Sequence, residues 1–190
     1  MRTSIALYFL FLLAIGAGRL VEMQISKRNR ARLLANGATT GRDPHFGAMV
    51  VLHTGILIAA FLEAWLLDRP FIPALALPMI VLFIACNLLR WWVIRTLAGH
   101  WNVRVMDSRA LGVVTSGPYR FIRHPNYAAV FLELLAVPLI HTAYLTAIIG
   151  LLLHLWVLSG RIRAEEAVLL ANPEYVSGMG RKPRFIPGLL

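Results

Sequence analysis

Five long apolar runs, separated by short polar segments, dominate the chain; they cover residues 5–23, 46–67, 72–97, 128–140 and 143–158. A helix needs about 20 mostly apolar residues to cross a hydrocarbon layer about 30 Å thick. The first three runs therefore predict transmembrane helices. Only His141-Thr142 separate the last two runs, and Pro138 just before them predicts a tight helical hairpin. The fold class that follows is an all-α polytopic membrane bundle with about five transmembrane helices.

The first apolar run follows Arg2 and could be taken for a signal peptide. It continues through Leu20-Val21 without a clear small-residue cleavage site, so we interpret it as a retained span. Arg19 and Glu22 near its end lie about one helical turn apart, where they can pair with each other or extend toward water.

Composition favours a membrane protein over a soluble one. The 190 residues are 58% hydrophobic with a mean hydropathy of +0.68, well above the usual soluble balance. The length fits one domain, residues 1–190, rather than two. A net charge of +10 could indicate a nucleic-acid partner. However, the basic residues are spread between the apolar runs and no recognised nucleic-acid-reading motif accompanies them, so we expect no such partner.

The distribution of basic residues predicts an orientation. Sixteen of the 19 lysines and arginines lie in three places: after the first run, at or after the end of the third run, and after the fifth run. These three places are on the same side of the predicted membrane. Only Arg2 and Arg69 fall on the opposite side, and Arg19 lies inside the first run. Since cytoplasmic loops carry the excess of Lys and Arg, the N-terminus is predicted outside and the C-terminus in the cytoplasm.

Two polar clusters at membrane edges are the candidates for chemistry, because ionisable groups close to a bilayer tend to mark function. The first is Arg123-His124-Pro125-Asn126-Tyr127 at the start of the fourth run. Pro125 suits the first turn of a helix, and the amides of that turn could receive an anionic group. The second is Glu165-Glu166, on a helix expected to continue from the fifth run over 159–171 until Asn172-Pro173 ends it.

Each cluster also has a simpler interpretation. Arg123 could anchor to lipid phosphates while His124 caps the helix. Arg161 and Glu165 could form an ordinary surface i,i+4 pair, worth a few tenths of a kcal/mol. His45 and His53 are about two helical turns apart and could share a face. With no HExxH motif, Cys/His cluster, GxGxxG motif or P-loop, and a single cysteine, Cys86, we expect no metal site.

Several motifs in the C-terminal half occur in the order of a known family. They are Leu111-Gly112-Val113-Val114-Thr115-Ser116-Gly117-Pro118-Tyr119-Arg120, then Arg123 to Tyr127, then Glu165-Glu166 with Tyr175, then Arg184-Phe185-Ile186-Pro187. Together they resemble the isoprenylcysteine carboxyl methyltransferase family, which is related to membrane phospholipid methyltransferases. The resemblance covers roughly residues 95–188. It divides the domain into three N-terminal spans, residues 1–98, and a methyltransferase-like half, residues 99–190.

The resemblance implies S-adenosylmethionine bound at the cytoplasmic membrane edge. The cofactor contacts of the family correspond to Val114, Tyr119, His124 and Tyr127. We add three further candidates for cofactor binding: Arg123, Pro125 and Glu166. The catalytic arginine and glutamate of the family, near the acceptor, correspond to Arg161 and Glu165. The chain departs from the family pattern at Ala129, Asn172-Pro173 and Met179, which leaves the acceptor open. Residues 22–53, with Ser26-Lys27-Arg28-Asn29, resemble a bacterial branch associated with polyketide-type lipids, which implies the bacterial inner membrane.

The leading functional interpretation is O-methylation of a lipophilic acceptor that arrives from the bilayer. No strong dedicated base is recognisable, which suits an acceptor already ionised near neutral pH, such as a carboxylate or an acidic enol or phenol. Three alternatives stay open: methylation of a phospholipid amine, an NADPH-dependent membrane reductase, and a non-catalytic membrane scaffold. The sequence alone does not give the oligomeric state.

Overall fold

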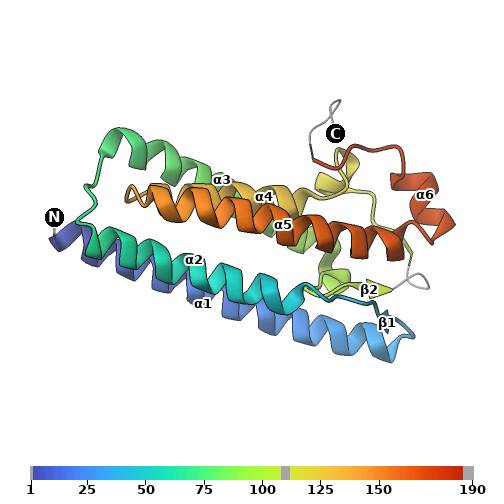
Figure 1. Cartoon of the computed structure of the whole chain (residues 1–190). Helices are drawn as coiled ribbons and strands as arrows, with labels where there is room; N and C mark the ends of the chain where they lie inside the picture. The colour runs from blue at the N-terminus through green and yellow to red at the C-terminus, as the bar shows by residue number, and fades with distance from the viewer. Residues whose placement is uncertain (1, 108–111, 186–190) are drawn as a thin grey trace.

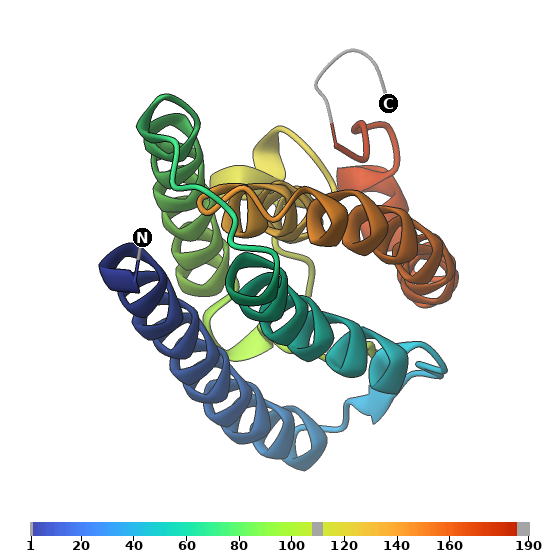
Figure 2. The same ribbon diagram turned by 60° about the vertical axis from the view of Figure 1, so that its left-hand side comes forward.

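Five helices run along a common direction and alternate in sense, which gives the molecule an elongated shape (Figures 1 and 2). The structure is a computed structural model that describes residues 2–107 and 112–185. The helices are α1 (Arg2–Ala35), α2 (Phe46–Leu66), α3 (Pro73–Leu97), α4 (Pro125–Leu139) and α5 (Tyr144–Leu169). The predicted all-α bundle is therefore confirmed.

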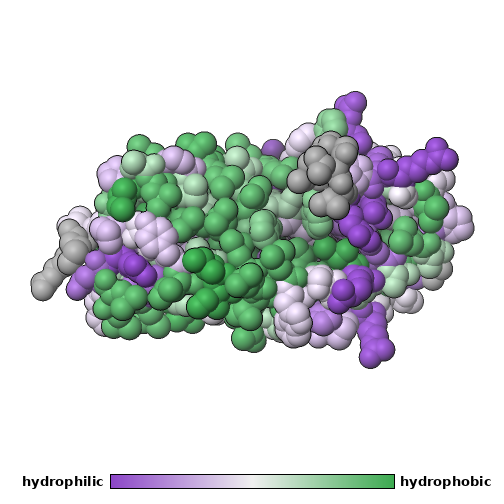
Figure 3. All heavy atoms as spheres, turned by 45° about the horizontal axis from the view of Figure 1, so that its top comes forward, coloured by the Kyte–Doolittle hydropathy of each residue, from purple (hydrophilic) through white to green (hydrophobic). Residues whose placement is uncertain are grey.

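Four helices, α1, α2, α3 and α5, are long and apolar enough to cross a membrane. On the face drawn in Figure 3 the middle of the molecule is largely hydrophobic, and most hydrophilic side chains gather toward one end, with a smaller group at the other. The fourth predicted span is also a helix, but α4 has only 15 residues. At 1.5 Å per residue it is about 22 Å long, short of the hydrocarbon thickness.

The helical hairpin predicted between the last two runs is present. The amide of Ala143 donates to the carbonyl of Pro138 at 3.0 Å, and α5 begins one residue later. Thr142 adopts a φ of 54° in this turn, and its hydroxyl donates to the carbonyl of Pro70 at 2.7 Å. The turn is thereby tied to the segment that joins α2 to α3.

Two helices differ in extent from the sequence-based expectation. Helix α1 continues twelve residues past the predicted end of the first span, to Ala35, so that at 1.5 Å per residue it is about 50 Å long. Helix α5 ends at Leu169, two residues before its predicted end, and a further short helix, α6 (Pro173–Met179), follows it. Asn172-Pro173, expected to end α5, start α6, because the Asn172 side chain caps its N-terminus and Pro173 occupies its first turn.

Small residues bring the helices together in the apolar half of the bundle. Ala60, Ala64 and Ala143 are completely buried and pack with Tyr8 and Val137, whose neighbours in the same core cluster are Leu12, Ile15 and Ile140. Small side chains allow the close helix approach that membrane bundles depend on. The Tyr8 hydroxyl donates to the carbonyl of Val137 at 3.0 Å, so this buried polar group is paired.

The extension of α1 holds the connector that follows α3. The Ser26 hydroxyl accepts from the amide of Val103 at 3.0 Å. The Asn29 side chain donates to the carbonyls of Ala98 and Trp101, at 3.0 and 2.8 Å. Farther along, the strands β1 (Thr39–Thr40) and β2 (Met106–Asp107) pair in antiparallel register. These contacts fix residues 98–107, including the short helix η1 (Ala98–His100), against the N-terminal half.

Candidate active site

A cavity of about 750 Å³ opens between the helices and the connector, and its lining includes residues from the start of α4 and the end of α5. Seven of the predicted site residues line it: Val114, Tyr119, Arg123, His124, Tyr127, Arg161 and Glu165. Two do not, Pro125 and Glu166. The two polar clusters of the sequence, almost forty residues apart, therefore meet at one cavity.

Arg161 is buried and uses every nitrogen of its guanidinium group. Its Nε donates to the Tyr127 hydroxyl at 2.9 Å, its Nη1 donates to Asp43 at 3.1 Å, and its Nη2 donates to the carbonyl of Val103. Since a guanidinium carries five N–H bonds, these contacts leave two for a ligand. The surface pair predicted between Arg161 and Glu165 is not among the ion pairs of the described residues, because Asp43 takes that place.

Tyr127 links Arg161 to the second predicted catalytic residue. Its hydroxyl accepts from Arg161 and donates to a carboxylate oxygen of Glu165. The three residues therefore form one relay between α4 and α5, and each of them lines the cavity. The carboxylate is held beside Arg161 through the tyrosine instead of by direct contact.

Glu166 gathers three cationic or potentially cationic side chains on the other side of α5. Its carboxylate accepts from both sides of the Arg184 guanidinium, at 3.0 and 2.6 Å, and lies 3.0 Å from Arg123 and 3.1 Å from His124 Nε2. The hydrogen bonds that Arg184 donates to this carboxylate also raise the pKa of Arg184 above its already high ordinary value. Glu166 is thus placed to position two cavity-lining side chains, Arg123 and His124, without lining the cavity itself.

The C-terminal segment passes over the start of α4. The amides of Arg123 and His124 donate to the carbonyls of Pro183 and Arg184, at 2.9 and 3.0 Å. The ring of Phe185 lies 6.0 Å from the ring of His124. Two of the family-like motifs are therefore in contact, since the segment of Arg184 and Phe185 covers the motif that begins at Arg123. Leu111, Ile186 and Pro187 of these motifs, and the basic Arg109, lie outside the described residues.

The simpler interpretation of the first cluster does not hold in the structure. His124 precedes α4 with non-helical backbone angles, as expected before a proline, but its side chain makes no capping hydrogen bond. It points to Glu166 instead, at 3.1 Å. Arg123 likewise pairs with Glu166, so neither side chain is free to serve only as a cap or a lipid anchor.

Two tyrosines complete the polar end of the cavity. Tyr119, in the short helix η3 (Gly117–Arg120), and Tyr175, in α6, both line it. Burial raises the pKa of Tyr175 to about 12, with a further contribution from nearby Glu165. Burial also raises the pKa of Tyr119 above its usual value, again with help from Glu165. Both phenols are therefore neutral at neutral pH.

Sequence reasoning did not identify Asp43 as a site residue. Its side chain is 3% exposed and is the acidic partner of Arg161, 118 residues away. The only local signal was an acidic residue within a basic segment just before the second apolar run. His45 and His53, left open from the sequence, have different surroundings: His45 packs against Gly160, and His53 lines the cavity.

The region that builds this site matches a known family. The sequence model of the isoprenylcysteine carboxyl methyltransferase (ICMT) family matches residues 79–171, from within α3 to the end of α5. The similarity to the ICMT family therefore covers 93 residues, just under half of the chain. Together with the four helices that are long and apolar enough to cross a membrane, this similarity indicates an integral membrane protein related to a methyltransferase family.

Two bacterial relatives extend the similarity beyond the matched region. "Uncharacterized protein YpbQ" of Bacillus subtilis (strain 168) is 27% identical over 164 residues, which cover 86% of this chain and 96% of the relative. An "Uncharacterized protein" of Haemophilus influenzae is 28% identical over 152 residues, 80% of this chain and 88% of the relative. Both alignments are longer than the 93 residues of the matched region, so the similarity to these relatives extends beyond it.

Proposed function

We propose that the protein uses S-adenosylmethionine to methylate an oxygen atom of a lipophilic acceptor drawn from the bilayer. The observation that carries this proposal is the composition of the cavity described above. Its lining combines polar side chains, among them Arg161, Glu165 and His124, with apolar residues of α1 and α2 such as Leu20 and Val50. A charged methyl donor and a greasy acceptor can meet in one such space.

The polar end suits S-adenosylmethionine in charge and size. Ligand pockets typically enclose about 300–1,000 Å³, and the volume of this cavity lies in that range. Arg123 offers a cation for the carboxylate of the donor, and Glu165 offers an anion for its ammonium or sulfonium group. Tyr119 and Tyr175, as neutral aromatic rings, can pack against the adenine. We assign Val114 and His124 to the same half of the cavity.

Arg161 is the proposed contact for the acceptor oxygen. Its two remaining N–H bonds can hold an oxyanion, while Asp43 and Tyr127 fix the plane of the guanidinium. A planar guanidinium with two free N–H bonds suits an anionic acceptor, such as a carboxylate or an acidic enol or phenol, better than the amine of a phospholipid.

Positioning supplies most of the catalysis in this proposal. S-adenosylmethionine brings a methyl group already activated by its sulfonium. The protein has to align the acceptor oxygen with that group, which can account for several kcal/mol of the barrier. Arg161 and the Tyr127–Glu165 relay orient the acceptor, and the C-terminal segment over α4 limits water at the polar end. An acceptor that is already ionised needs no dedicated base.

Calorimetry on the detergent-purified protein tests the proposal first. S-adenosylmethionine is expected to bind, whereas NADPH is not; the opposite result would favour a reductase, and binding of neither would favour a scaffold. Transfer of a labelled methyl group from S-adenosylmethionine to lipid extracts of the native host then tests the reaction. A labelled product that releases its methyl group on ester or enol-ether cleavage supports O-methylation, whereas label on a phospholipid amine contradicts it.

A further inference from the structure

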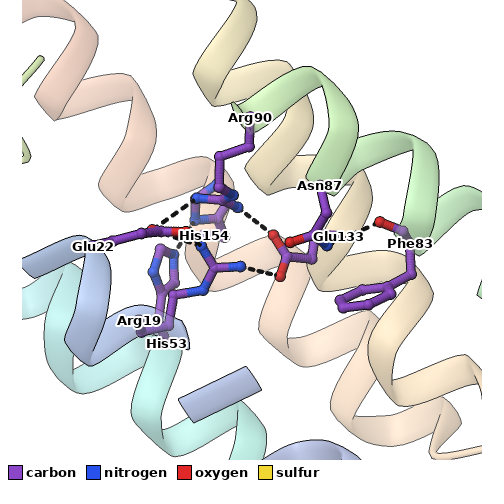
Figure 4. A network of polar contacts seen from close by, with 8 residues as sticks. All are labelled: Arg19, Glu22, His53, Phe83, Asn87, Arg90, Glu133 and His154. Carbon is purple, nitrogen blue, oxygen red and sulfur yellow. Dashed lines mark hydrogen bonds and ion pairs between the residues drawn. The ribbon is translucent and has the colours of Figure 1, made fainter. Parts of the chain in front are cut away.

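A second polar group faces the cavity deeper in the bundle. Arg19 and Glu22 of α1, Arg90 of α3 and Glu133 of α4 form an ionic cluster (Figure 4). Arg19 Nη1 donates to both carboxylate oxygens of Glu22, at 2.6 and 2.7 Å, and its Nη2 donates to Glu133. Arg90 donates to Glu133 from its Nη2, and its Nη1 lies 3.6 Å from Glu22.

Two histidines from the remaining helices lie beside this ionic cluster (Figure 4). His53 of α2 and His154 of α5 have their Nε2 and Nδ1 atoms 3.4 Å apart. His154 is completely buried, and its Nε2 has no hydrogen-bond partner among the described residues; the same is true of Arg90 Nε. All five long helices thus bring ionisable side chains to one place within the bundle.

The position of this group relative to the reaction site follows from helix geometry. His154 precedes Arg161 by seven residues on α5, about 10 Å along the axis and on nearly the same face. Glu133 follows Tyr127 by six residues on α4, about 9 Å along the axis. Helices α4 and α5 therefore independently place the ionic cluster and the neighbouring histidines about 10 Å from Tyr127 and Arg161, toward the middle of the bundle.

The lining between the two polar positions is apolar. Along the chain, Met49 lies between Asp43 and His53 and Val130 lies between Tyr127 and Glu133, and both line the cavity together with Val93, three residues after Arg90. A ligand that fills this space meets polar, then apolar, then polar surroundings.

A purely structural role does not account for this arrangement. Buried ion pairs within a membrane bundle are costly, and networks that only hold helices together gain from being sealed. Here Arg19, Glu22, His53 and Arg90 all line the same cavity as Arg161. The ionic cluster has two positive and two negative side chains, so it carries no net charge. An added carboxylate would be an unbalanced buried charge, whereas a neutral oxygen can accept a hydrogen bond at little electrostatic cost.

We propose that the ionic cluster and His53 form a second subsite, which binds a neutral hydroxyl or carbonyl group of the acceptor about 10 Å from the methylated oxygen. This rests on the function proposed above and narrows its substrate class. The acceptor is an amphiphile with two oxygen-bearing groups separated by an apolar segment. His53 makes the direct contact, and the ionic cluster holds donors from Arg19 and Arg90 around it.

The first test substitutes His53, because this leaves the ionic cluster intact. In His53→Leu the amount of host lipid extract that gives half the maximal methyl-transfer rate is expected to rise about five- to tenfold, as for the loss of one hydrogen bond. The affinity for S-adenosylmethionine and the maximal rate are expected to stay near those of the unmodified protein. His53→Gln, which keeps a hydrogen-bonding group, is expected to recover part of the loss.

The matched control is His141→Leu, since His141 is a buried histidine near the opposite end of the bundle and does not line the cavity. It should leave the half-saturating amount of extract unchanged. An unchanged amount in His53→Leu would overturn the subsite. So would a parallel loss of cofactor affinity, maximal rate and thermal stability, which would indicate a structural histidine. If the unmodified protein neither binds the cofactor nor transfers methyl groups, the proposed function fails and not only the subsite.

The second test addresses the class of group that binds. Decanoic acid, its ω-hydroxy derivative and decanedioic acid are compared as competitors of methyl transfer to the lipid extract. The ω-hydroxy acid is expected to compete best in the unmodified protein and to lose its advantage in His53→Leu. Glu22→Gln, which gives the ionic cluster a net positive charge, is expected to improve competition by decanedioic acid selectively. Equal competition by the three acids, or an advantage of the dicarboxylic acid in the unmodified protein, would overturn the assignment of a neutral group.

Discussion

Arg161 donates a hydrogen bond from its Nε to the hydroxyl oxygen of Tyr127, at 2.9 Å, across the interface between α5 and α4. Tyr127 in turn donates to Glu165. The guanidinium and the carboxylate that the family pattern places near the acceptor are therefore held apart by a phenol. This spacing leaves both groups facing the cavity, where a direct pair would have turned them toward each other.

This arrangement predicts a separation between acceptor handling and cofactor binding. Arg161→Ala is expected to reduce methyl transfer about a hundredfold or more, because a preorganised donor to the acceptor oxygen is lost. Arg161→Lys is expected to recover little, since a point charge does not reproduce the planar fork of the guanidinium. S-adenosylmethionine affinity, measured by calorimetry, should stay nearly unchanged in both variants.

Removal of Arg161 alone would leave Asp43 buried without its partner, which can cost several kcal/mol of stability. The double variant Arg161→Ala with Asp43→Asn removes both charges and serves as the control for folding. If the double variant is stable and still transfers methyl groups at the normal rate, Arg161 does not contact the acceptor. If cofactor affinity falls in proportion to activity, Arg161 belongs to the donor half of the cavity.

His124 is expected to act on the cofactor side. His124→Ala should weaken S-adenosylmethionine binding about tenfold, in line with the loss of a buried polar contact worth 1–3 kcal/mol. The bundle should remain folded, because Arg123 and Arg184 still pair with Glu166. The measurement is calorimetric titration beside a thermal melt, with His141→Ala as the matched control. Unchanged affinity would remove His124 from the donor half.

The helices and the two polar clusters could be predicted from the sequence because both are local signals. Runs of apolar residues mark spans wherever they pack, and His124 with Pro125 marks the start of a helix by its own backbone preferences. Pro138 predicted the hairpin for the same reason. Such features depend on neighbours within a few positions, which a single sequence displays directly.

The parts that could not be predicted depend on contacts between distant residues. Helix α1 extends through a polar segment because Ser26 and Asn29 bind a connector more than 65 residues away, which no local pattern reveals. Glu133 is a single carboxylate within an apolar run, and its partners Arg19 and Arg90 are 114 and 43 residues distant. The ionic cluster therefore exists only once the helices are packed.

The turn that carries Tyr119 depends on a glycine. Gly117 has a φ of +56°, and a Cβ built there would lie 2.4 Å from Thr96 Oγ1 and 2.8 Å from its Cγ2. Gly117→Ala is therefore expected to lower the free energy of unfolding by about 2–4 kcal/mol, from backbone strain and the clash together. The midpoint of a thermal melt should fall accordingly, and cofactor affinity should fall with it because η3 is displaced.

Gly37→Ala is the matched control for Gly117→Ala. Gly37 also has a positive φ, +86°, but nothing lies within 4 Å of its built Cβ, so only the backbone strain of about 1–2 kcal/mol remains. Its cofactor affinity should be normal. Equal destabilisation by the two substitutions would mean that the contact with Thr96 is relieved by a small shift of the connector.

The last prediction concerns orientation, which places the cavity on one side of the membrane. The polar ends of α1 and α5, the connector after α3 and the start of α4 all lie at the same end of the bundle (Figure 1). Because most lysines and arginines belong to these segments, that end is predicted to be cytoplasmic. A reporter fused after Leu190 should therefore read as cytoplasmic, and one inserted near Arg69 as external. A second pair of reporters, after Ala35 and in place of His141-Thr142, should reproduce this difference independently. An external signal after both Ala35 and Leu190 would put the cavity on the far side of the membrane, away from the cytoplasmic supply of S-adenosylmethionine, and would contradict the proposed reaction as well as the orientation.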